Sequence, residues 1–320
     1  MATRKKLKKG VWVFFVVILF LSIAIYSGIN IYKDYQYKQT YEYKLLEIGY
    51  TKDEVNKLKE VFKNEELDIF LESEKNEDIL NLIDEKYFLK KNFEKYLSYK
   101  EKNKKKELSE IVRNINLHLD KKYYEELQNT NQSLDTLMLV NKYYALPSDY
   151  EPTDLVTIST KYAWGTKGSK KTRQVTLDAF LEMWDQAMED GYYLMINSAY
   201  RSYQDQEKVY NDRKNSRGEK YADSVAARPG SSEHQTGLSL DIFSKNNSNQ
   251  STFKDTPEAA WLKENAHKYG FVLRYPEDKV NITGYSYESW HYRYVGVDVA
   301  TKCFEENITF DEYYAYYLEK

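Results

Sequence analysis

Two histidines and two carboxylates lie in short segments whose residue types suit hydrolytic chemistry. His234 and Asp241 stand seven positions apart around a glycine, and Glu288 and His291 stand three positions apart further along the chain. A catalytic zinc ion commonly takes three protein ligands and keeps a fourth position for a water molecule, whose pKa falls to about 7. Two neutral imidazoles and one carboxylate could hold such an ion, and Glu288 is placed to act as a general base.

A third segment supplies an arginine that could complete such a site. Arg201 carries a planar, permanently charged group that could stabilise an oxyanion or bind a substrate carboxylate. Gly237 would permit the turn that brings His234 back toward Asp241. The spacing of these residues leaves a simpler interpretation equally open, in which a surface histidine lies beside a strand carboxylate and no metal is bound.

The elements that must position these residues follow from the apolar pattern of the C-terminal part of the chain. Alternating and β-prone runs predict strands at 137–144, 192–197, 238–243 and 291–295. Apolar residues at helical spacing predict helices at 176–191, 204–214, 256–269 and 311–318, and the segment 215–232 is typical of a loop. On the strand 238–243, which we expect to be half-buried, Asp241 would point away from the aliphatic face.

Composition limits the classes of function. The chain has 320 residues, of which 42% are hydrophobic and 16% aromatic, so it can form a packed core. Its net charge is only −3, with 47 basic and 50 acidic residues, and we therefore expect no nucleic-acid partner. The single cysteine, Cys303, cannot form a disulfide within the chain, and we expect it to be a small buried apolar residue.

The N-terminal residues predict a membrane anchor. A nearly unbroken apolar run occupies 11–32, and about 20 such residues span a bilayer as a helix. The basic tail 1–10 would stay in the cytoplasm and the rest of the chain would lie outside, because five positive charges precede the run: Arg4, Lys5, Lys6, Lys8 and Lys9. The alternative is a cleaved signal peptide, but the run is longer than an ordinary signal core, which favours the uncleaved single-pass anchor.

Three motifs, in order, resemble those of the VanY-type D-alanyl-D-alanine carboxypeptidases, which are zinc peptidases of the bacterial cell wall. The resemblance covers roughly 137–297. Its motifs read Ser198-x-Tyr200-Arg201-Ser202-x3-Gln206, Ser232-x-His234-x2-Gly237-x3-Asp241 and Glu288-x-Trp290-His291. The resemblance implies an α+β fold for 131–320, in which a small antiparallel sheet flanked by helices carries a zinc site.

The same resemblance implies a role for each motif residue. His234, Asp241 and His291 would bind Zn²⁺, Glu288 would be the catalytic base and Arg201 would stabilise the oxyanion. The residues expected to bind substrate are Gln206, Ser232, Tyr200 and Ser198. Ser289 departs from the family pattern, which commonly has proline there, and this puts the rigidity of the local turn in question.

The implied activity is removal of the C-terminal D-alanine from peptidoglycan stem peptides. Two alternatives stay open: an LD-carboxypeptidase that acts on tetrapeptide stems, and a wall-binding module without turnover. An intact Glu288 argues against the second, because a purely structural zinc site needs no base.

The family pattern does not extend to 33–130, which is highly charged and has apolar residues at helical spacing. The residues Thr51 to Glu54 match a capping box, and His118 stands alone, as a structural histidine would. We expect a helical spacer between the membrane and the enzyme domain. The alternative is a module that binds cell-wall polymer or another protein.

Overall fold

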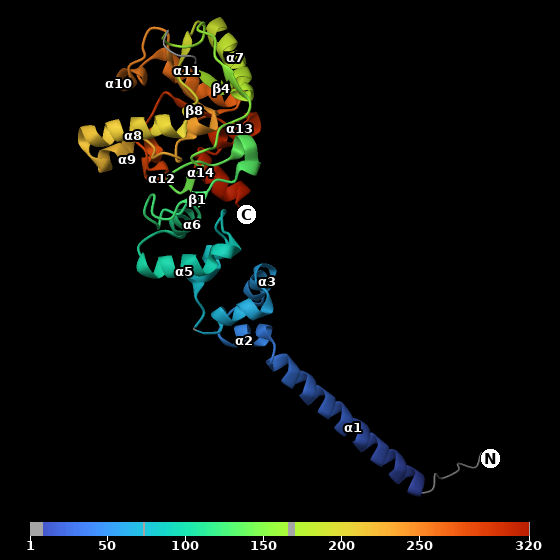
Figure 1. Ribbon diagram of the computed structural model, residues 1–320. Coiled ribbons are helices and arrows are strands. Elements are labelled where there is room, and N and C mark those ends of the chain that lie inside the picture. Colours follow the sequence, from blue (N-terminus) through green and yellow to red (C-terminus); the bar gives the residue numbers. More distant parts are fainter. Residues whose placement is uncertain (1–8, 73, 166–169, 320) are drawn as a thin grey trace, which may run out of the picture. The chain divides into compact units, whose positions relative to one another are not determined.

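The computed structural model describes residues 9–72, 74–165 and 170–319 (Figure 1). The chain forms two compact units, Met1–Lys91 and Asn92–Lys320. The boundary expected at residue 130 divides a spacer from an enzyme domain, which is a division by function. The two compact units are divided by packing, so they do not test it, and the boundary stays a prediction.

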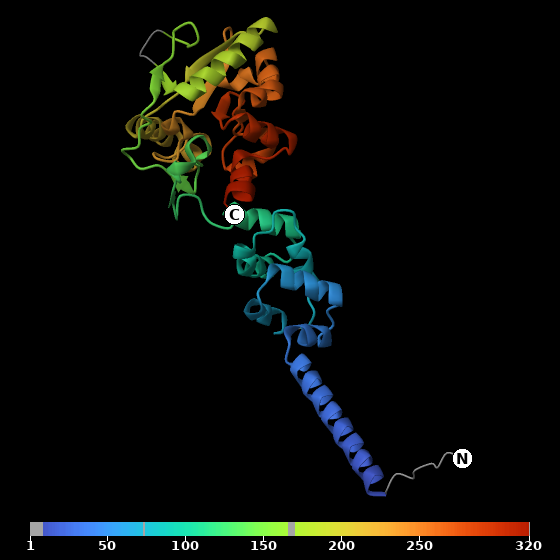
Figure 2. The same ribbon diagram turned by 90° about the vertical axis from the view of Figure 1, so that its right-hand side faces the viewer.

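The first unit begins with α1 (Lys9–Lys38), which Figure 2 shows as one unbroken helix in blue. Its 30 residues give a length of about 45 Å, which exceeds the apolar thickness of a bilayer. The apolar side chains from Val11 to Ile31 are almost all exposed. It is the one helix, within the described ranges, that is long and apolar enough to cross a membrane. The basic residues Arg4, Lys5, Lys6 and Lys8 lie outside the described residues.

The rest of the first unit is helical, as expected. The predicted capping box is present, since Thr51 Oγ1 accepts from the backbone N–H of Glu54 at 3.3 Å and the Glu54 carboxylate accepts from that of Thr51 at 2.8 Å. Leu45, Val55 and Leu58 are fully buried in its core. The elements are α2 (Tyr41–Glu47), α3 (Lys52–Val61), η1 (Asn64–Phe70) and α4 (Glu77–Ile83). The short turn η2 (Lys90–Asn92) lies in the chain where the first unit ends and the second begins.

The second unit is built on a four-stranded antiparallel sheet with the order β5-β6-β8-β7. The strands are β5 (Leu194–Ser198), β6 (Ser239–Ser244), β8 (His291–Tyr294) and β7 (Phe271–Leu273). The first three confirm the strands predicted at 192–197, 238–243 and 291–295. Two smaller pairs are β1 (Gln128–Asn129) with β2 (Tyr144–Ala145), and β3 (Leu155–Thr157) with β4 (Lys171–Arg173).

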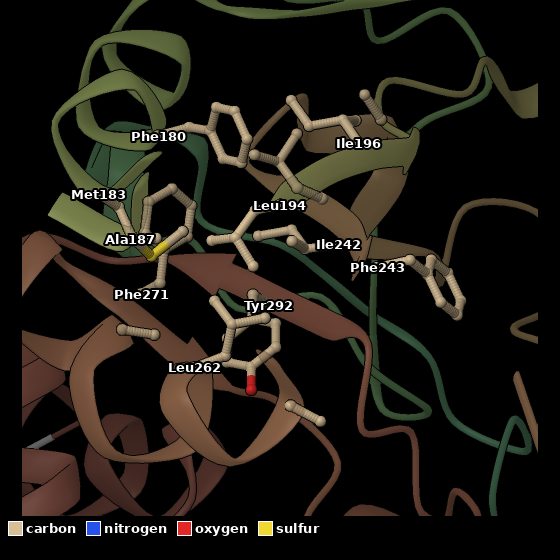
Figure 3. Packing of buried hydrophobic residues seen from close by; sticks show 14 of the residues in the cluster. Phe180, Met183, Ala187, Leu194, Ile196, Ile242, Phe243, Leu262, Phe271 and Tyr292 are labelled. Atoms are coloured by element: carbon tan, nitrogen blue, oxygen red, sulfur yellow. The ribbon is translucent and has the colours of Figure 1, made fainter. Parts of the chain in front are cut away.

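The two faces of this sheet differ in chemistry. One face is apolar and packs against α7 (Gln174–Glu189) and α11 (Pro257–Asn265). Figure 3 shows the side chains that meet there, which include Phe180, Met183, Leu194, Ile242, Leu262 and Tyr292. Asp241 and His291 lie opposite each other on the other face, as the alternation predicts. The expectation of a half-buried β6 was wrong, because every residue of β6 is buried and its polar face is covered as well.

The rest of the second unit consists of further helices and of the loops that join them. Those predicted at 176–191, 204–214, 256–269 and 311–318 are confirmed within a few residues. The described elements are α5 (Phe93–Lys102), α6 (Leu108–Asn116), η3 (Gln132–Leu137), α8 (Tyr203–Arg217), α9 (Glu219–Val225), η4 (Glu233–Thr236), α10 (Gln250–Phe253), η5 (Ala266–Tyr269), η6 (Glu277–Lys279), α12 (Val280–Thr283), α13 (Val297–Glu305), α14 (Phe310–Tyr313) and the π turn η7 (Tyr314–Leu318).

Two further sequence predictions were wrong. The segment 215–232 contains the helix α9, which buries Ala222. The strand predicted at 137–144 is limited to its last residue, since β2 begins at Tyr144. The Asn141 side chain explains the difference, because its Oδ1 accepts from the backbone N–H groups of Tyr143 and Tyr144 at 2.8 and 3.0 Å. A local turn thus uses donors that a strand would need.

Candidate metal centre and active site

The register of the sheet brings Asp241 and His291 together. They are direct partners on β6 and β8, and Oδ1 of Asp241 lies 3.2 Å from Nδ1 of His291. Side chains of directly opposed residues point to the same face of a sheet, so a shift of one residue in this pairing would separate them. Two residues that are fifty positions apart in the chain therefore meet through backbone pairing.

His234 reaches the same point from the turn η4, which precedes β6. Gly237 ends that turn with φ +67°, a left-handed conformation that glycine adopts without strain. Nε2 of His234 lies 3.4 Å from Oδ1 of Asp241, and Nδ1 lies 2.7 Å from the carbonyl oxygen of Ala199. Because a carbonyl only accepts, Nδ1 carries the proton and Nε2 presents its lone pair to the site.

These three side chains fit a divalent metal ion. One donor atom from each of His234, Asp241 and His291 lies within 4.8 Å of the others, and all three residues are buried. Zinc bonds of about 2.0–2.1 Å in a tetrahedron place neighbouring ligands about 3.3 Å apart. Oδ1 of Asp241 lies 3.2 Å from Nδ1 of His291 and 3.4 Å from Nε2 of His234, and both distances agree with this ligand-to-ligand separation.

The charges in the cluster also favour a cation. Burial alone would raise the pKa of Asp241, but the two imidazoles hold it well below its usual range, so the carboxylate stays ionised. Burial lowers the pKa of His234. Burial would also lower the pKa of His291, but Asp241 and Glu233 raise it to about 9. The negative charges of Asp241 and Glu233 thus favour a positive charge at this point.

Glu288 lies beside the cluster without completing it. Its Oε2 is 3.8 Å from Nδ1 of His291. Burial is the main cause that raises the pKa of Glu288 to about 7, and the negative charge of Asp241 adds to it. A carboxyl group that titrates near neutrality can both accept and return a proton, as a general base requires.

Arg201 is held in place by two of the predicted substrate residues. Its Nη1 donates to Oε1 of Gln206 at 2.6 Å and its Nη2 donates to Oγ of Ser198 at 3.0 Å. A β-bulge after Ile196 inserts one extra residue into β5, so Ser198 pairs with Asp241. The bulge therefore turns Ser198 toward the metal side of the sheet, where it meets Arg201.

One cavity of about 120 Å³ joins the metal cluster to Arg201, Gln206 and Glu288. Ser232 and Trp290 also line it. Ser198 and Tyr200, which the motif implied for substrate, do not, and Tyr200 is half-buried outside it. The position of these two residues favours support of the site over direct contact with a ligand in this cavity.

Glu233 is a residue of the site that the sequence analysis missed. Its Oε1 accepts from Nε of Arg274 at 2.7 Å and from Nη1 of Arg293 at 2.9 Å, and its Oε2 lies 3.5 Å from Nε2 of His291. Burial alone would raise the pKa of Glu233, but the two arginines hold it well below its usual range. The available signal was weak: Arg293 shares a strand face with His291, and a buried arginine needs an acid.

His118 and Cys303 are structural, as predicted, and so is His267. The His267 ring stacks on Phe304 with centroids 4.0 Å apart, and Nε2 of His118 lies 3.2 Å from the Tyr144 hydroxyl. Cys303 is buried, and burial raises the pKa of its thiol to about 12, so the thiol stays protonated.

Comparison with known proteins relates the chain to a family of carboxypeptidases. Residues 169–297 match the VanY family, described as D-alanyl-D-alanine carboxypeptidase. The chain is 38% identical over 213 residues to "Putative carboxypeptidase YodJ" of Bacillus subtilis (strain 168), covering 63% of this chain and 78% of that protein. It is 35% identical over 191 residues to a D-alanyl-D-alanine carboxypeptidase of Enterococcus faecium, covering 58% of this chain and 59% of that protein.

A solved structure shares the fold. The LdcB LD-carboxypeptidase is 40% identical in the matched region, with a TM-score of 0.56, and the match covers 61% of this chain and 92% of that one. The α+β architecture expected for the C-terminal part is therefore found in an enzyme of known structure.

Proposed function

Since the chain belongs to the VanY D-alanyl-D-alanine carboxypeptidase family, we propose that it is a zinc-dependent carboxypeptidase that removes the C-terminal D-alanine from peptidoglycan stem peptides. The observation that carries the proposal is the meeting of His234, Asp241 and His291 with Glu288 and Arg201 in one cavity. Two neutral nitrogen donors and one carboxylate suit a catalytic metal site, and a buried base beside them suits hydrolysis.

The ion would be held by His234, Asp241 and His291, and when bound it would lower the pKa of a water molecule and polarise the scissile carbonyl group. Glu288 accepts a proton from the attacking water and returns it to the amine that leaves. Its pKa of about 7 allows both transfers near neutral pH. Arg201 is oriented by Gln206 and Ser198, and its remaining N–H groups can donate to the oxyanion that develops.

The decisive experiment measures metal content and product masses with the full-length chain in detergent. We expect about one zinc ion per chain and release of D-alanine from a pentapeptide stem. Glu288→Gln should still bind the metal, and its kcat should fall by about 10²- to 10⁴-fold. Absence of zinc, or wild-type turnover by Glu288→Gln, would contradict the proposal.

An LD-carboxypeptidase that acts on tetrapeptide stems is the second candidate. It is favoured by the 40% identity to the LdcB LD-carboxypeptidase. Both reactions use the same residues and differ in how the pocket treats the penultimate residue. Mass spectrometry of digested muropeptides separates them, since a tetrapeptide product indicates DD cleavage and a tripeptide product indicates LD cleavage. Unchanged pentapeptide and tetrapeptide would instead favour a wall-binding module without turnover.

We also propose that α1 anchors the protein in the cell membrane as a single span, with the catalytic residues on the outer side and residues 33–130 as a spacer. The apolar composition and length of α1 support the anchor. Protease added to intact spheroplasts should digest the catalytic part. Its full protection, with digestion only after lysis, would contradict this orientation.

A further inference from the structure

We propose that Arg213 selects substrates by binding a carboxylate about three residues before the C-terminal residue of the peptide. This inference rests on the proposed carboxypeptidase function and adds a determinant for the middle of the substrate. It follows from the position of Arg213 on α8, from its lack of a partner among the residues that the structure describes and from the charges that line the cavity.

One face of α8 leads from the catalytic arginine to solvent. Gln206, Val209 and Arg213 are spaced three and then four residues apart, so they share a helix face, and all three line the cavity that holds the metal cluster. Gln206 is buried and accepts a hydrogen bond from Arg201, whereas Arg213 is exposed. This face of α8 thus begins beside Arg201 and the metal cluster and ends where the cavity opens to solvent.

The distance along this helix face determines which residue of a bound peptide Arg213 can reach. Seven residues of helix advance about 10 Å, and an extended peptide advances about 3.3–3.6 Å per residue. A substrate whose C-terminal residue lies beside Arg201 and Gln206 and whose chain follows α8 outward brings its third preceding residue to Arg213.

Arg213 is free to bind an external group. Nothing among the described residues forms a salt bridge or side-chain hydrogen bond with its guanidinium. Its neighbours on α8 are engaged, since Lys208 pairs with Asp205, Lys214 pairs with Glu219 and Arg217 lies over the Tyr221 ring. An unpaired guanidinium at a cavity mouth suits two-point recognition of a carboxylate.

The charge around Arg213 supports an anionic partner. The acids that line the cavity are Glu233, Asp241 and Glu288, and all three belong to the metal end. Of the described lining residues, Arg201 and Arg213 are the arginines, and Arg201 is already held by Gln206 and Ser198. Among the described residues that line the cavity, no acid lies outside the metal end, so an anionic group in the middle of the substrate would meet Arg213 as the nearest lining charge.

Two pentapeptides that end in D-Ala-D-Ala test this inference. They differ only at the second residue, which is γ-linked D-glutamate with a free carboxylate in one and its amide in the other. We expect wild-type kcat/KM to be about three- to tenfold higher for the carboxylate, mainly through KM, with the ratio falling as salt is added. Arg213→Gln should bring the ratio close to one with kcat on the amide peptide unchanged, and Arg213→Lys should restore part of it.

Lys214→Gln is the matched control, because it removes the same charge from the same helix at a residue that does not line the cavity. Binding of both peptides to Glu288→Gln gives a readout that needs no turnover. A wild-type ratio of one, or an unchanged ratio in Arg213→Gln, would overturn the inference and leave the carboxypeptidase proposal standing. Failure of wild type to hydrolyse or bind either peptide would overturn both.

Discussion

Nε2 of His291 lies 3.5 Å from Oε2 of Glu233, while the other oxygen of that carboxylate accepts hydrogen bonds from Arg274 and Arg293. The contact to His291 is longer than a normal hydrogen bond, and Nε2 has no partner within bonding distance in the described part of the chain. A metal on Nδ1 would place the proton on Nε2, where Glu233 can accept it. Glu233 is therefore in position to orient His291 as a ligand.

Glu233→Gln should weaken both metal binding and folding. The amide is a poorer acceptor for His291, so we expect zinc affinity to fall by about 10- to 100-fold in a competition with a chelating dye. The change also leaves two buried arginines without their shared carboxylate, and the loss of one partner of a buried ion pair costs about 3–5 kcal/mol. Urea unfolding measures this cost.

The same carboxylate gives a pH dependence of stability. Its pKa is lowered in the folded protein, so its contribution is fully present above about pH 4.5, its usual value, and is lost as the pH falls below it. Wild type should therefore lose more stability between pH 5 and 3 than Glu233→Gln does. Glu277→Gln, a change at an exposed acid, should behave like wild type. Equal acid sensitivity of Glu233→Gln and wild type would rule out this contribution.

The activity should fall on the acid side of neutrality. Glu288 must be ionised to accept a proton, and burial raises its pKa to about 7. A bound divalent cation lowers that pKa, so we expect the acid limb of kcat/KM to have its midpoint at or below about pH 7. Initial rates at constant metal saturation would show this limb. A kcat/KM profile that shows no acid limb anywhere in the pH range in which the protein stays folded would exclude Glu288 as the base.

Removal of the metal should abolish turnover and lower stability together. Dialysis against a chelator should inactivate the protein, and added Zn²⁺ should restore activity. At a free zinc concentration of about 1,000 Kd the ion would stabilise the folded state by about 4 kcal/mol, which a rise in the urea midpoint would report. Mg²⁺ should not substitute, because it prefers oxygen ligands in octahedral geometry. Full activity after chelation would contradict the metal assignment.

The parts of the fold that the sequence predicted are those with a local signal. Alternation of apolar and polar residues predicted β6 and β8, and apolar residues at helical spacing predicted α7 and α11. The strand β7 gave no such signal, because its three residues, Phe271–Leu273, are all apolar and too few to show a period. The helix α9 was missed because Gly218 and the charged residues around it resemble a loop.

The same division applies to the site. The motifs could be recognised in the sequence because each one spans only a few positions, although the motifs themselves meet through strand pairing. The role of Glu233 depends on Arg274 and Arg293, which are 41 and 60 positions away. A buried acid looks like a surface acid in a sequence, since burial is decided by partners that only the fold brings near. The bulge that turns Ser198 toward Arg201 is likewise a property of strand pairing.

Gly237→Ala tests whether the turn between the ligands His234 and Asp241 determines the stability and the metal affinity of the site. The residue has φ +67°, and an added Cβ would lie 2.9 Å from Cγ of Arg173 and 3.1 Å from Cδ2 of Leu155. Gly191→Ala is the matched control, because Gly191 has φ +88° with no atom within 4 Å of the added Cβ, so it introduces backbone strain without a clash. We expect Gly237→Ala to lose about 1–3 kcal/mol more than the control in urea unfolding. Its zinc affinity should also fall, because His234 would move relative to Asp241, whereas the affinity of Gly191→Ala should match wild type. Equal losses in the two variants would mean that the clash relaxes without disturbing the ligands.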